Sequence, residues 1–304
     1  MMTFITALIP IMMLIMLGYI LKRSKFLPEN TWAGIEKLTY YILFPALLIG
    51  TLAKQSVIGV AWPAMLFVVL FTLLTSALLL ILLRKKLTNS DATFTSIFQG
   101  GLRFNTYIML AIAQSLYGAV GLAMGSVAAG FMIVLINLCC ISVFAVWGKA
   151  TFQGGGQFIK AIIANPLIIT CAIGWFLSIT GIGLPFIAEN ILEIIGRAAL
   201  PLGLLAVGAA LKLKSIKGHF SAIVIASIFQ FIIKPIITVT LIAYIGLTGI
   251  AAAVLIIAFM TPTAPSAYIL ARQLGGDTDT MASIITLQTL AAFIIMPLLG
   301  ALFL

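Results

Sequence analysis

Long apolar stretches recur along the whole chain and are separated by short polar joints. Most are close to, or longer than, the roughly 20 residues that an α-helix needs to cross the hydrocarbon core of a bilayer. Spanning β-strands would instead show short segments that alternate polar and apolar residues. The pattern therefore predicts an all-α polytopic membrane protein with ten transmembrane helices, at residues 3–21, 32–53, 62–83, 91–117, 120–146, 158–180, 190–211, 219–244, 250–274 and 279–303.

The composition agrees with this prediction. Hydrophobic residues make up 63% of the chain and charged residues 8%, and the mean hydropathy is +1.26, whereas soluble proteins carry about 25% charged residues. Basic residues follow the first apolar run instead of preceding it, which predicts a retained helix and not a cleaved signal peptide. The cysteines Cys139, Cys140 and Cys171 lie in apolar segments and are expected to be reduced packing residues.

The formal net charge of +10 is distributed unevenly along the chain. A Lys/Arg excess marks the cytoplasmic loops of a membrane protein. With ten helices, this bias places both termini on the extracytoplasmic side of the cell membrane. The charge thus indicates orientation and headgroup contact, and not nucleic-acid binding. The basic residues of these alternate loops are Lys22, Arg23, Lys25, Arg84, Lys85, Lys86, Lys149, Lys160, Lys212, Lys214, Lys217 and Arg272.

The two halves of the chain resemble each other. Pro28 aligns with Pro185 and Pro45 with Pro201, at offsets of 157 and 156 residues. Residues 1–146 and 158–304 each hold five predicted helices, and a Gly-rich linker at 147–157 joins them. Because five is odd, the second half enters the membrane from the opposite face, so the repeat is inverted. Inverted repeats are typical of secondary transporters.

Polar and helix-breaking residues interrupt the fourth and ninth predicted helices. The interruptions are "QGGLRFNT" at 99–106 and "MTPTAPS" at 260–266, and the repeat aligns Asn105 with Thr263. Equivalent breaks in both halves of a transporter mark its binding site, because non-helical backbone at membrane depth is tolerated where it lines a watered cavity. The alternative is a pair of Pro/Gly kinks that only shape packing.

The residues at these breaks predict an anion site. A half-helix that starts within the membrane offers free amides and a partial positive charge. Asn105 and Thr263 are expected to cap the two starts, and Pro265 suits a first helical turn. We predict that substrate contacts Arg103, Asn105, Thr106, Thr261, Thr263 and Ser266, and that Gly100, Gly101, Pro262 and Pro265 shape the crossover.

Two basic residues, Arg103 and Lys234, lie within predicted helices. Ionisable residues at such depth are costly and usually functional. Arg103 either contacts an anionic substrate or neutralises the C-terminal end of the first half-helix. Lys234 has three interpretations. It stands in for a bound sodium ion, it changes protonation during transport, or its side chain snorkels to an interface.

The remaining polar residues narrow the function further. Gln99, Asn137, Gln230 and Gln288 either line the cavity or tie helices together. All carboxylates map near helix ends, which argues against a carboxylate relay and against cationic substrates. The chain has no nucleotide-binding loop, metal-binding motif or nucleophile–base constellation, so we predict no cofactor, no metal site and no enzymatic activity. The carboxylates are Glu29, Glu36, Asp91, Glu189, Glu193, Asp277 and Asp279.

Three stretches, "RFNTYIMLAIAQSLYG" (103–118), "IIKPIITV" (232–239) and "TPTAPSAYILARQLGGD" (261–277), resemble the auxin efflux carrier family, which includes microbial malate or malonate permeases. The resemblance implies a fold similar to bile-acid and sodium/proton carriers, with helices four and nine crossing at their breaks. It maps the family's broken-helix asparagine onto Asn105 and its crossing proline onto Pro262 or Pro265. The long central loop of the plant members is replaced here by the short linker.

The same resemblance implies two spatial domains and an elevator-like movement. Helices one, two, six and seven would form a scaffold and dimer domain, and helices three to five and eight to ten a mobile transport domain. We therefore expect a homodimeric carrier of small organic anions, such as malate, malonate or auxin-like acids, in a lipid bilayer. One alternative is a sodium- or proton-coupled carrier of another solute, including a neutral one. Another is a membrane sensor or channel.

Overall fold

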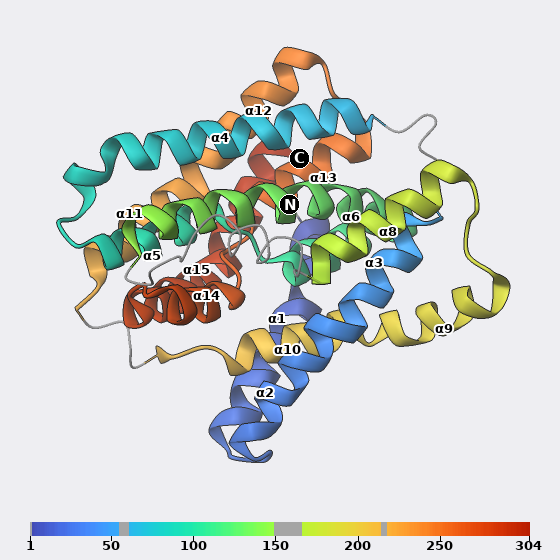
Figure 1. Cartoon of the computed structure of the whole chain (residues 1–304), viewed down its shortest axis with the longest axis horizontal. Coiled ribbons are helices and arrows are strands. Elements are labelled where there is room, and N and C mark those ends of the chain that lie inside the picture. Colours follow the sequence, from blue (N-terminus) through green and yellow to red (C-terminus); the bar gives the residue numbers. More distant parts are fainter. Residues whose placement is uncertain (1, 55–60, 149–165, 214–217) are drawn as a thin grey trace.

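The computed structural model describes residues 2–54, 61–148, 166–213 and 218–304 (Figure 1). All regular structure in these ranges is helical, and it covers the apolar segments found in the sequence as far as these are described. The all-α prediction is therefore confirmed for the described part of the chain. The elements are α1 (Met2–Arg23), α2 (Glu29–Leu38), η1 (Thr39–Leu43), α3 (Phe44–Leu52), α4 (Trp62–Leu87), α5 (Asp91–Leu102), α6 (Thr106–Trp147), α8 (Pro166–Thr180), α9 (Phe186–Arg197), α10 (Ala199–Ala209), α11 (Phe220–Ile228), η3 (Phe229–Ile233), α12 (Lys234–Ile245), α13 (Gly249–Met260), α14 (Ser266–Leu274) and α15 (Thr278–Phe303).

The helical stretches are long and apolar enough for a multi-pass membrane protein. Two further apolar helices, α8 and α13, are shorter than a full span. Residues 149–157 of the predicted linker, and 158–165 of the sixth predicted helix, lie outside the described residues. Among the described residues, seven stretches qualify as candidate spans: Thr3–Arg23, Glu29–Leu52, Trp62–Leu87, Asp91–Trp147, Phe186–Ala209, Phe220–Ile245 and Thr278–Phe303.

The long α6 contains one internal break. Gly118 has a φ of 59° and a ψ of −144°, so the backbone there is not helical. Glycine adopts such a conformation without steric cost because it has no Cβ. The break falls between the predicted helices 91–117 and 120–146 and lets the chain reverse direction between them.

Two of the helices contain a single π-helical turn, η1 before Pro45 and η3 before Pro235. A proline inside a helix removes one backbone donor and clashes with the preceding turn, and a π turn gives the chain an extra residue there. Single π turns within α-helices often occur at functional sites. Here η1 carries Tyr40 and η3 immediately precedes Lys234.

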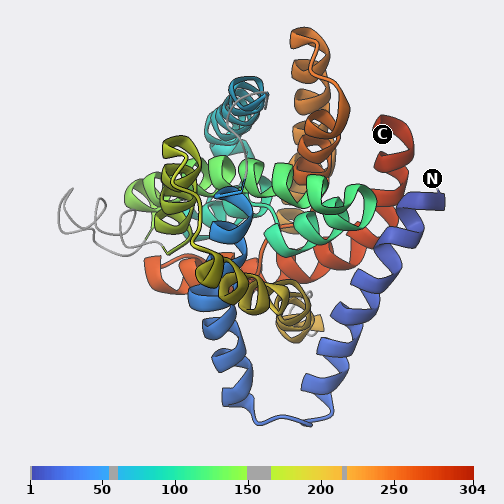
Figure 2. The same cartoon turned by 90° about the vertical axis from the view of Figure 1, so that its right-hand side faces the viewer.

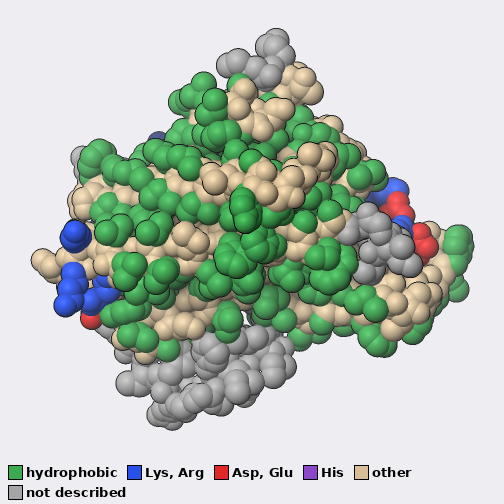
Figure 3. Space-filling model, turned by 90° about the horizontal axis from the view of Figure 1, so that it is seen from above, with side chains coloured by type: hydrophobic (Ala, Val, Ile, Leu, Met, Phe, Trp, Pro, Cys, Tyr) green, Lys and Arg blue, Asp and Glu red, His purple; other side chains and the backbone are tan. Residues whose placement is uncertain are grey.

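The surface separates apolar from charged side chains. Figure 3 shows hydrophobic side chains across most of the visible face, with Lys, Arg, Asp and Glu gathered toward its two opposite ends. Large apolar side chains on α4 are among the exposed ones, including Leu74, Leu78 and Leu82. An apolar belt between charged ends is the arrangement that a bilayer requires.

The packing contacts fall into two groups of helices, which also touch each other where α1 contacts α15. In one group α1 packs on α10, and α3 packs on α8 and α9; in the other α5 packs on α11 and α15, and α12 on α4 and α13. The long α6 contacts both groups. The two termini lie beside each other (Figures 1 and 2), where Gly300 of α15 packs against the ring of Phe4.

Both predicted interruptions are present, but they are shorter than the sequence suggested. α5 ends at Leu102 and α6 begins at Thr106, while α13 ends at Met260 and α14 begins at Ser266. Gly100 and Gly101 therefore lie inside the last turn of α5 and do not break it.

These two glycines instead permit close helix packing. A Cβ added at Gly100 would lie 2.6 Å from Cγ2 of Ile284 in α15, and one at Gly101 would lie 2.9 Å from Cβ of Phe229 in η3. The absence of side chains lets α5 approach both neighbours, as small residues do in membrane helix interfaces.

Candidate functional site

The two interruptions lie against each other. Nε2 of Gln288, on α15, donates to the carbonyl oxygen of Gly100 at 3.0 Å, and its Oε1 accepts from the amide of Thr263 at 3.0 Å. The hydroxyl of Thr263 donates to the carbonyl oxygen of Gln99 at 3.4 Å, and Nε2 of Gln99 donates to the carbonyl oxygen of Ala267 at 3.3 Å. Gln288 thus links the last turn of α5 to the break at 261–265, and the two interruptions lie close together.

The helical stretch formed by η3 and α12 donates hydrogen bonds to the carbonyl ends of α5 and α13, the two half-helices that end at the breaks. Nζ of Lys234 donates to the carbonyl oxygens of Leu102, at 3.0 Å, and Arg103, at 3.3 Å. One turn earlier, Nε2 of Gln230 donates to the carbonyl oxygen of Thr261. Unpaired carbonyls at a helix end carry partial negative charge, and the fully buried Lys234 supplies hydrogen-bond donors to them at the end of α5.

This arrangement separates the two interpretations of Arg103. Its guanidinium does not return to the end of α5. Nη2 donates to Oδ1 of Asn137 in α6 at 2.9 Å, and Nε has no hydrogen-bond partner among the described residues. The side chain is 9% exposed and lines the cavity described below. The carbonyls at the end of α5 thus have Lys234, and not Arg103, as their side-chain partner, and contact of Arg103 with an anion stays a prediction.

The second half-helices begin in different ways. Oδ1 of Asn105 accepts from the amide of Ile108 at 3.2 Å, so the predicted cap of α6 is confirmed. Its Nδ2 is buried without a partner among the described residues. Pro265 precedes the first residue of α14, and no side chain caps that helix. The predicted cap by Thr263 is wrong, because Thr263 lies two residues too early and bonds to Gln288 and Gln99 instead.

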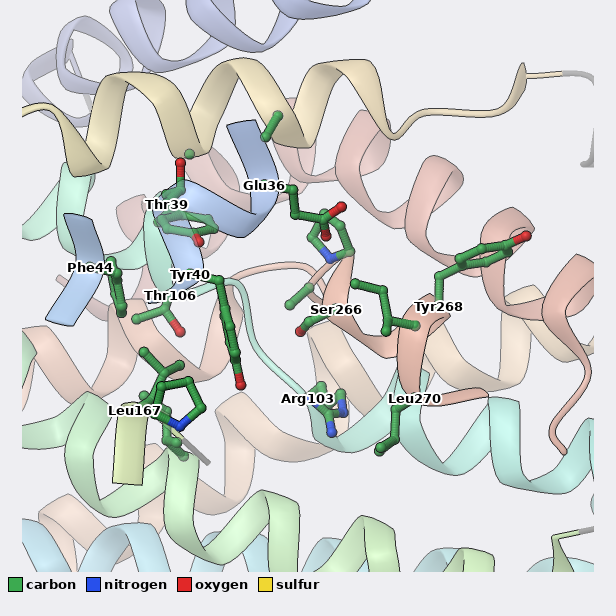
Figure 4. Close-up of a pocket in the computed structure, with 18 of the residues that line it drawn as sticks. Glu36, Thr39, Tyr40, Phe44, Arg103, Thr106, Leu167, Ser266, Tyr268 and Leu270 are labelled. Carbon is green, nitrogen blue, oxygen red and sulfur yellow. The ribbon is translucent and has the colours of Figure 1, made fainter. Parts of the chain in front are cut away.

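A cavity of about 740 Å³ opens where these helix starts meet the first group of helices (Figure 4). From the breaks it is lined by Arg103, Thr106, Pro265 and Ser266, all predicted site residues, and from α6 by Asn137. From α2, η1 and α3 it is lined by Glu36, Thr39, Tyr40 and Phe44, and from α8 by Pro166 and Leu167.

The other predicted site residues are buried beside the cavity and do not line it. Several of them make the hydrogen bonds that join the breaks, which supports the interpretation that Gln99, Gln230 and Gln288 tie helices together. Their contact with a substrate stays a prediction. These residues are Gln99, Gly100, Gly101, Asn105, Gln230, Lys234, Thr261, Pro262, Thr263 and Gln288.

Of the cavity residues that come from outside the breaks, Asn137 was a predicted lining residue and does line the cavity, but the sequence analysis missed most of the others. Glu36 was placed with the carboxylates near helix ends, but it is the eighth residue of the continuous stretch Glu29–Leu52 and lines the cavity. Tyr107, Tyr268 and Arg272 line it as well. Only the position of Tyr107, two residues after the capping Asn105, gave a signal in the sequence.

The charges in the cavity favour a small anion. Lys37, Arg103 and Arg272 line it together with one carboxylate, that of Glu36. The first turns of α6 and α14 contribute Thr106, Tyr107 and Ser266 to the wall, and helix starts favour negative charge. In Figure 4, Arg103 and Glu36 lie on opposite sides of Ser266.

A second polar cluster, at the ends of two candidate spans, ties α5 to α15. Oδ1 of Asp277 accepts from the amide of Thr280 at 3.0 Å and caps α15, while Oδ2 accepts from the hydroxyl of Thr93 at 3.0 Å. The hydroxyl of Thr280 also contacts Nδ1 of His219 at 2.8 Å. Burial alone would raise the pKa of the Asp277 carboxyl, but the bonds from Thr280 and Thr93, with His219 nearby, hold that pKa below its ordinary value of 3.8.

Comparison with known proteins places the chain in a family. The family model described as "Membrane transport protein" matches residues 3–153 and 148–299. An uncharacterized transporter of Methanothermobacter thermautotrophicus is 20% identical over 290 residues, covering 95% of this chain and 94% of that protein. An uncharacterized transporter of Methanocaldococcus jannaschii is 24% identical over 306 residues, covering 95% and 96%. The chain therefore belongs to the membrane transport protein family that includes the auxin efflux carriers, as its broken-helix motifs indicated.

Proposed function

We propose that the protein is a secondary transporter of small organic anions, mono- or dicarboxylates such as malate or malonate, or auxin-like acids. One observation carries the proposal: the buried, partly unpartnered guanidinium of Arg103 lines a cavity at the starts of two half-helices. A substrate carboxylate would accept hydrogen bonds from Arg103 and from the amides of Thr106 and Tyr107. Bonds between ionised partners are roughly twice as strong as neutral ones.

We further propose that the two halves are inverted repeats whose broken helices cross at the site. The interruptions at 103–105 and 261–265 occupy equivalent positions, and each is followed by a half-helix that contributes to the cavity. The neighbouring termini support an even number of crossings. The Lys/Arg bias supports an orientation with both termini on the extracytoplasmic side of the cell membrane.

For the mechanism we propose alternating access of the elevator type. A scaffold domain of α1–α3 and α8–α10 would stay fixed, in a homodimer, while α4–α6 and α11–α15 move with the substrate. The cavity supports this division because both groups line it. The membrane potential then contributes about 2.3 kcal/mol per charge per 100 mV to anion exit.

Counterflow of labelled malonate in proteoliposomes tests the proposal. Arg103→Gln should lower saturable uptake at least tenfold, because a charge-assisted hydrogen bond is worth about 1.5–3 kcal/mol. Arg197→Gln is the matched control, since Arg197 is exposed and pairs with Glu193 away from the cavity. Uptake by Arg103→Gln equal to that of the unmodified protein would refute the site, and unsaturable currents would indicate a channel.

Asn105 can be tested separately because its two side-chain groups have different roles. Asn105→Ala removes both the cap and the free donor, and we expect it to abolish transport. Asn105→Asp keeps an acceptor for the amide of Ile108 but removes the Nδ2 donor and adds a negative charge. If Asp restores folding but not malonate transport, Asn105 acts on the anion; if it restores both, Asn105 only caps α6.

Labelling from the two sides of the membrane tests alternating access. Ser266→Cys in a cysteine-free background puts a thiol in the cavity wall. An elevator predicts that an impermeant thiol reagent reaches this position from either side, and that malonate protects it from both. Labelling from one side only, with or without malonate, would contradict the mechanism while leaving the anion site intact.

A further inference from the structure

Glu36 is a carboxylate that stands in the same cavity as Arg103. It is half-buried on α2, and it makes no salt bridge among the described residues. Four other carboxylates in the described part of the chain do have basic partners: Glu29 pairs with Lys22, Asp91 with Arg84, Glu189 with Lys54, and Glu193 with Lys54 and Arg197. An unpaired carboxylate in a cavity whose other charges are basic requires an explanation.

Two cations act on Glu36 from neighbouring elements without pairing with it. They are Lys22 of α1 and Arg272 of α14. From its own helical stretch the cavity also contains Lys37, Tyr40 and Tyr41, from the break Arg103, and from α6 and α14 Tyr107 and Tyr268. The lining residues of α8 and α10 carry no titratable side chain.

An anion bound at Arg103 would therefore meet a second negative charge across the cavity. Figure 4 shows the Glu36 side chain directed into the space beside Ser266, at the start of α14. Like charges repel strongly where the surroundings are partly desolvated. A proton on Glu36 removes this repulsion.

We propose that Glu36 couples anion binding to proton binding, so that the carrier takes up one proton with each anion. This inference rests on the proposed function. By thermodynamic linkage the coupling is reciprocal, and a bound anion favours the protonated glutamic acid by the same factor. The proton comes from water on the side to which the cavity opens, and water on the other side receives it after the anion leaves. The net charge carried per anion falls by one.

Binding of malonate to the purified protein, measured by calorimetry between pH 5.5 and 8, tests the coupling. At pH 8, Glu36→Gln should bind malonate roughly tenfold more tightly than the unmodified protein, because the neutral amide mimics the protonated acid. The ratio of the two dissociation constants should approach one toward pH 5.5. Malonate's own titration affects both proteins equally and cancels in this ratio.

Two further variants sharpen the test. Glu36→Asp keeps a titratable group and should keep the pH dependence. Glu193→Gln, which removes a carboxylate that does not line the cavity, should follow the unmodified protein at every pH. In weak buffer, the unmodified protein should take up more protons on binding malonate than Glu36→Gln does.

The outcomes separate this inference from the function on which it rests. If Arg103→Gln weakens malonate binding but Glu36→Gln shows the same affinity, pH dependence and proton uptake as the unmodified protein, Glu36 coupling is refuted and the anion site stands. If neither malonate nor malate binds the unmodified protein, the proposed function fails and the coupling with it.

Discussion

The side-chain ammonium of Lys234 lies 3.0 Å from the carbonyl oxygen of Leu102, the last residue of α5. It also donates to the next carbonyl, that of Arg103. Gln230, one turn earlier, donates a hydrogen bond to the carbonyl of Thr261. One helix thus satisfies the ends of both broken helices. Its lysine places two hydrogen-bond donors at the carbonyl end of α5, and the role of this residue in ion coupling stays a prediction.

Replacing Lys234 should therefore lower stability and transport more than replacing an exposed residue of the same helical stretch. Lys234→Met keeps the apolar stem and removes the ammonium, so two buried carbonyls lose their donor, at about 1–3 kcal/mol for each unsatisfied group. We expect a lower melting temperature in detergent and loss of malonate counterflow. Ile232→Met is the control, because Ile232 is 52% exposed on the same helical stretch. A Lys234→Met protein as stable and active as the unmodified one would contradict this role.

Both hydrogen bonds of Gln288 should contribute to stability and to transport. Gln288→Leu leaves the carbonyl of Gly100 and the amide of Thr263 without partners, which we expect to lower the melting temperature and the rate of counterflow. Gln288→Glu keeps the acceptor for Thr263 and loses the donor to Gly100, so its effect should be intermediate. Gln114→Leu, at an exposed position of α6, is the control. Equal melting curves for Gln288→Leu and the control would show that the bridge does not matter.

Two Gly→Ala substitutions should change the stability of the protein in opposite directions. Gly100→Ala places a Cβ 2.6 Å from Ile284, and overpacking of this kind costs about 1–3 kcal/mol. Gly34 lies in α2 with nothing within 4 Å of an added Cβ, and there Gly→Ala should stabilise by about 0.4–1 kcal/mol through the unfolded state. Melting temperatures of the two variants check this. A stabilising Gly100→Ala would mean that α5 does not pack closely on α15.

Stability should depend on Asp277 in one pH range. Because its folded-state pKa lies below the ordinary 3.8, its contribution is fully present above that value and is lost as the pH falls through the folded-state pKa. Asp277→Ala also loses the cap of α15, worth about 1 kcal/mol. We expect melting temperatures below those of the unmodified protein at neutral pH, with the gap narrowing below pH 3.8.

Asp277→Asn separates the cap from the charge. Asparagine still caps a helix, so at neutral pH this variant should melt between Asp277→Ala and the unmodified protein. If all three proteins melt alike at neutral pH, the cluster with Thr93 and Thr280 does not stabilise the ends of α5 and α15.

Much of the architecture could be predicted from the sequence because the bilayer imposes local constraints. Each span must satisfy its own backbone within a run of apolar residues, so helices and their interruptions are visible in the sequence of residues alone. The cap by Asn105 is of the same kind, since it joins residues only three positions apart. The limits of the breaks were less accurate, because Gly100 and Gly101 serve packing against α15 and η3 and not the break itself.

The partners of the buried polar residues could only be decided by the tertiary structure. The sequence presented Arg103 and Lys234 as two cations with overlapping roles, and packing brought Lys234 to the end of α5 and turned Arg103 toward Asn137 and the cavity. Packing also brought Glu36 to the same cavity from α2, which is distant from Arg103 in the sequence. Helix formation depends on neighbouring residues, whereas the energy of a buried charge or amide depends on whichever groups the fold places around it.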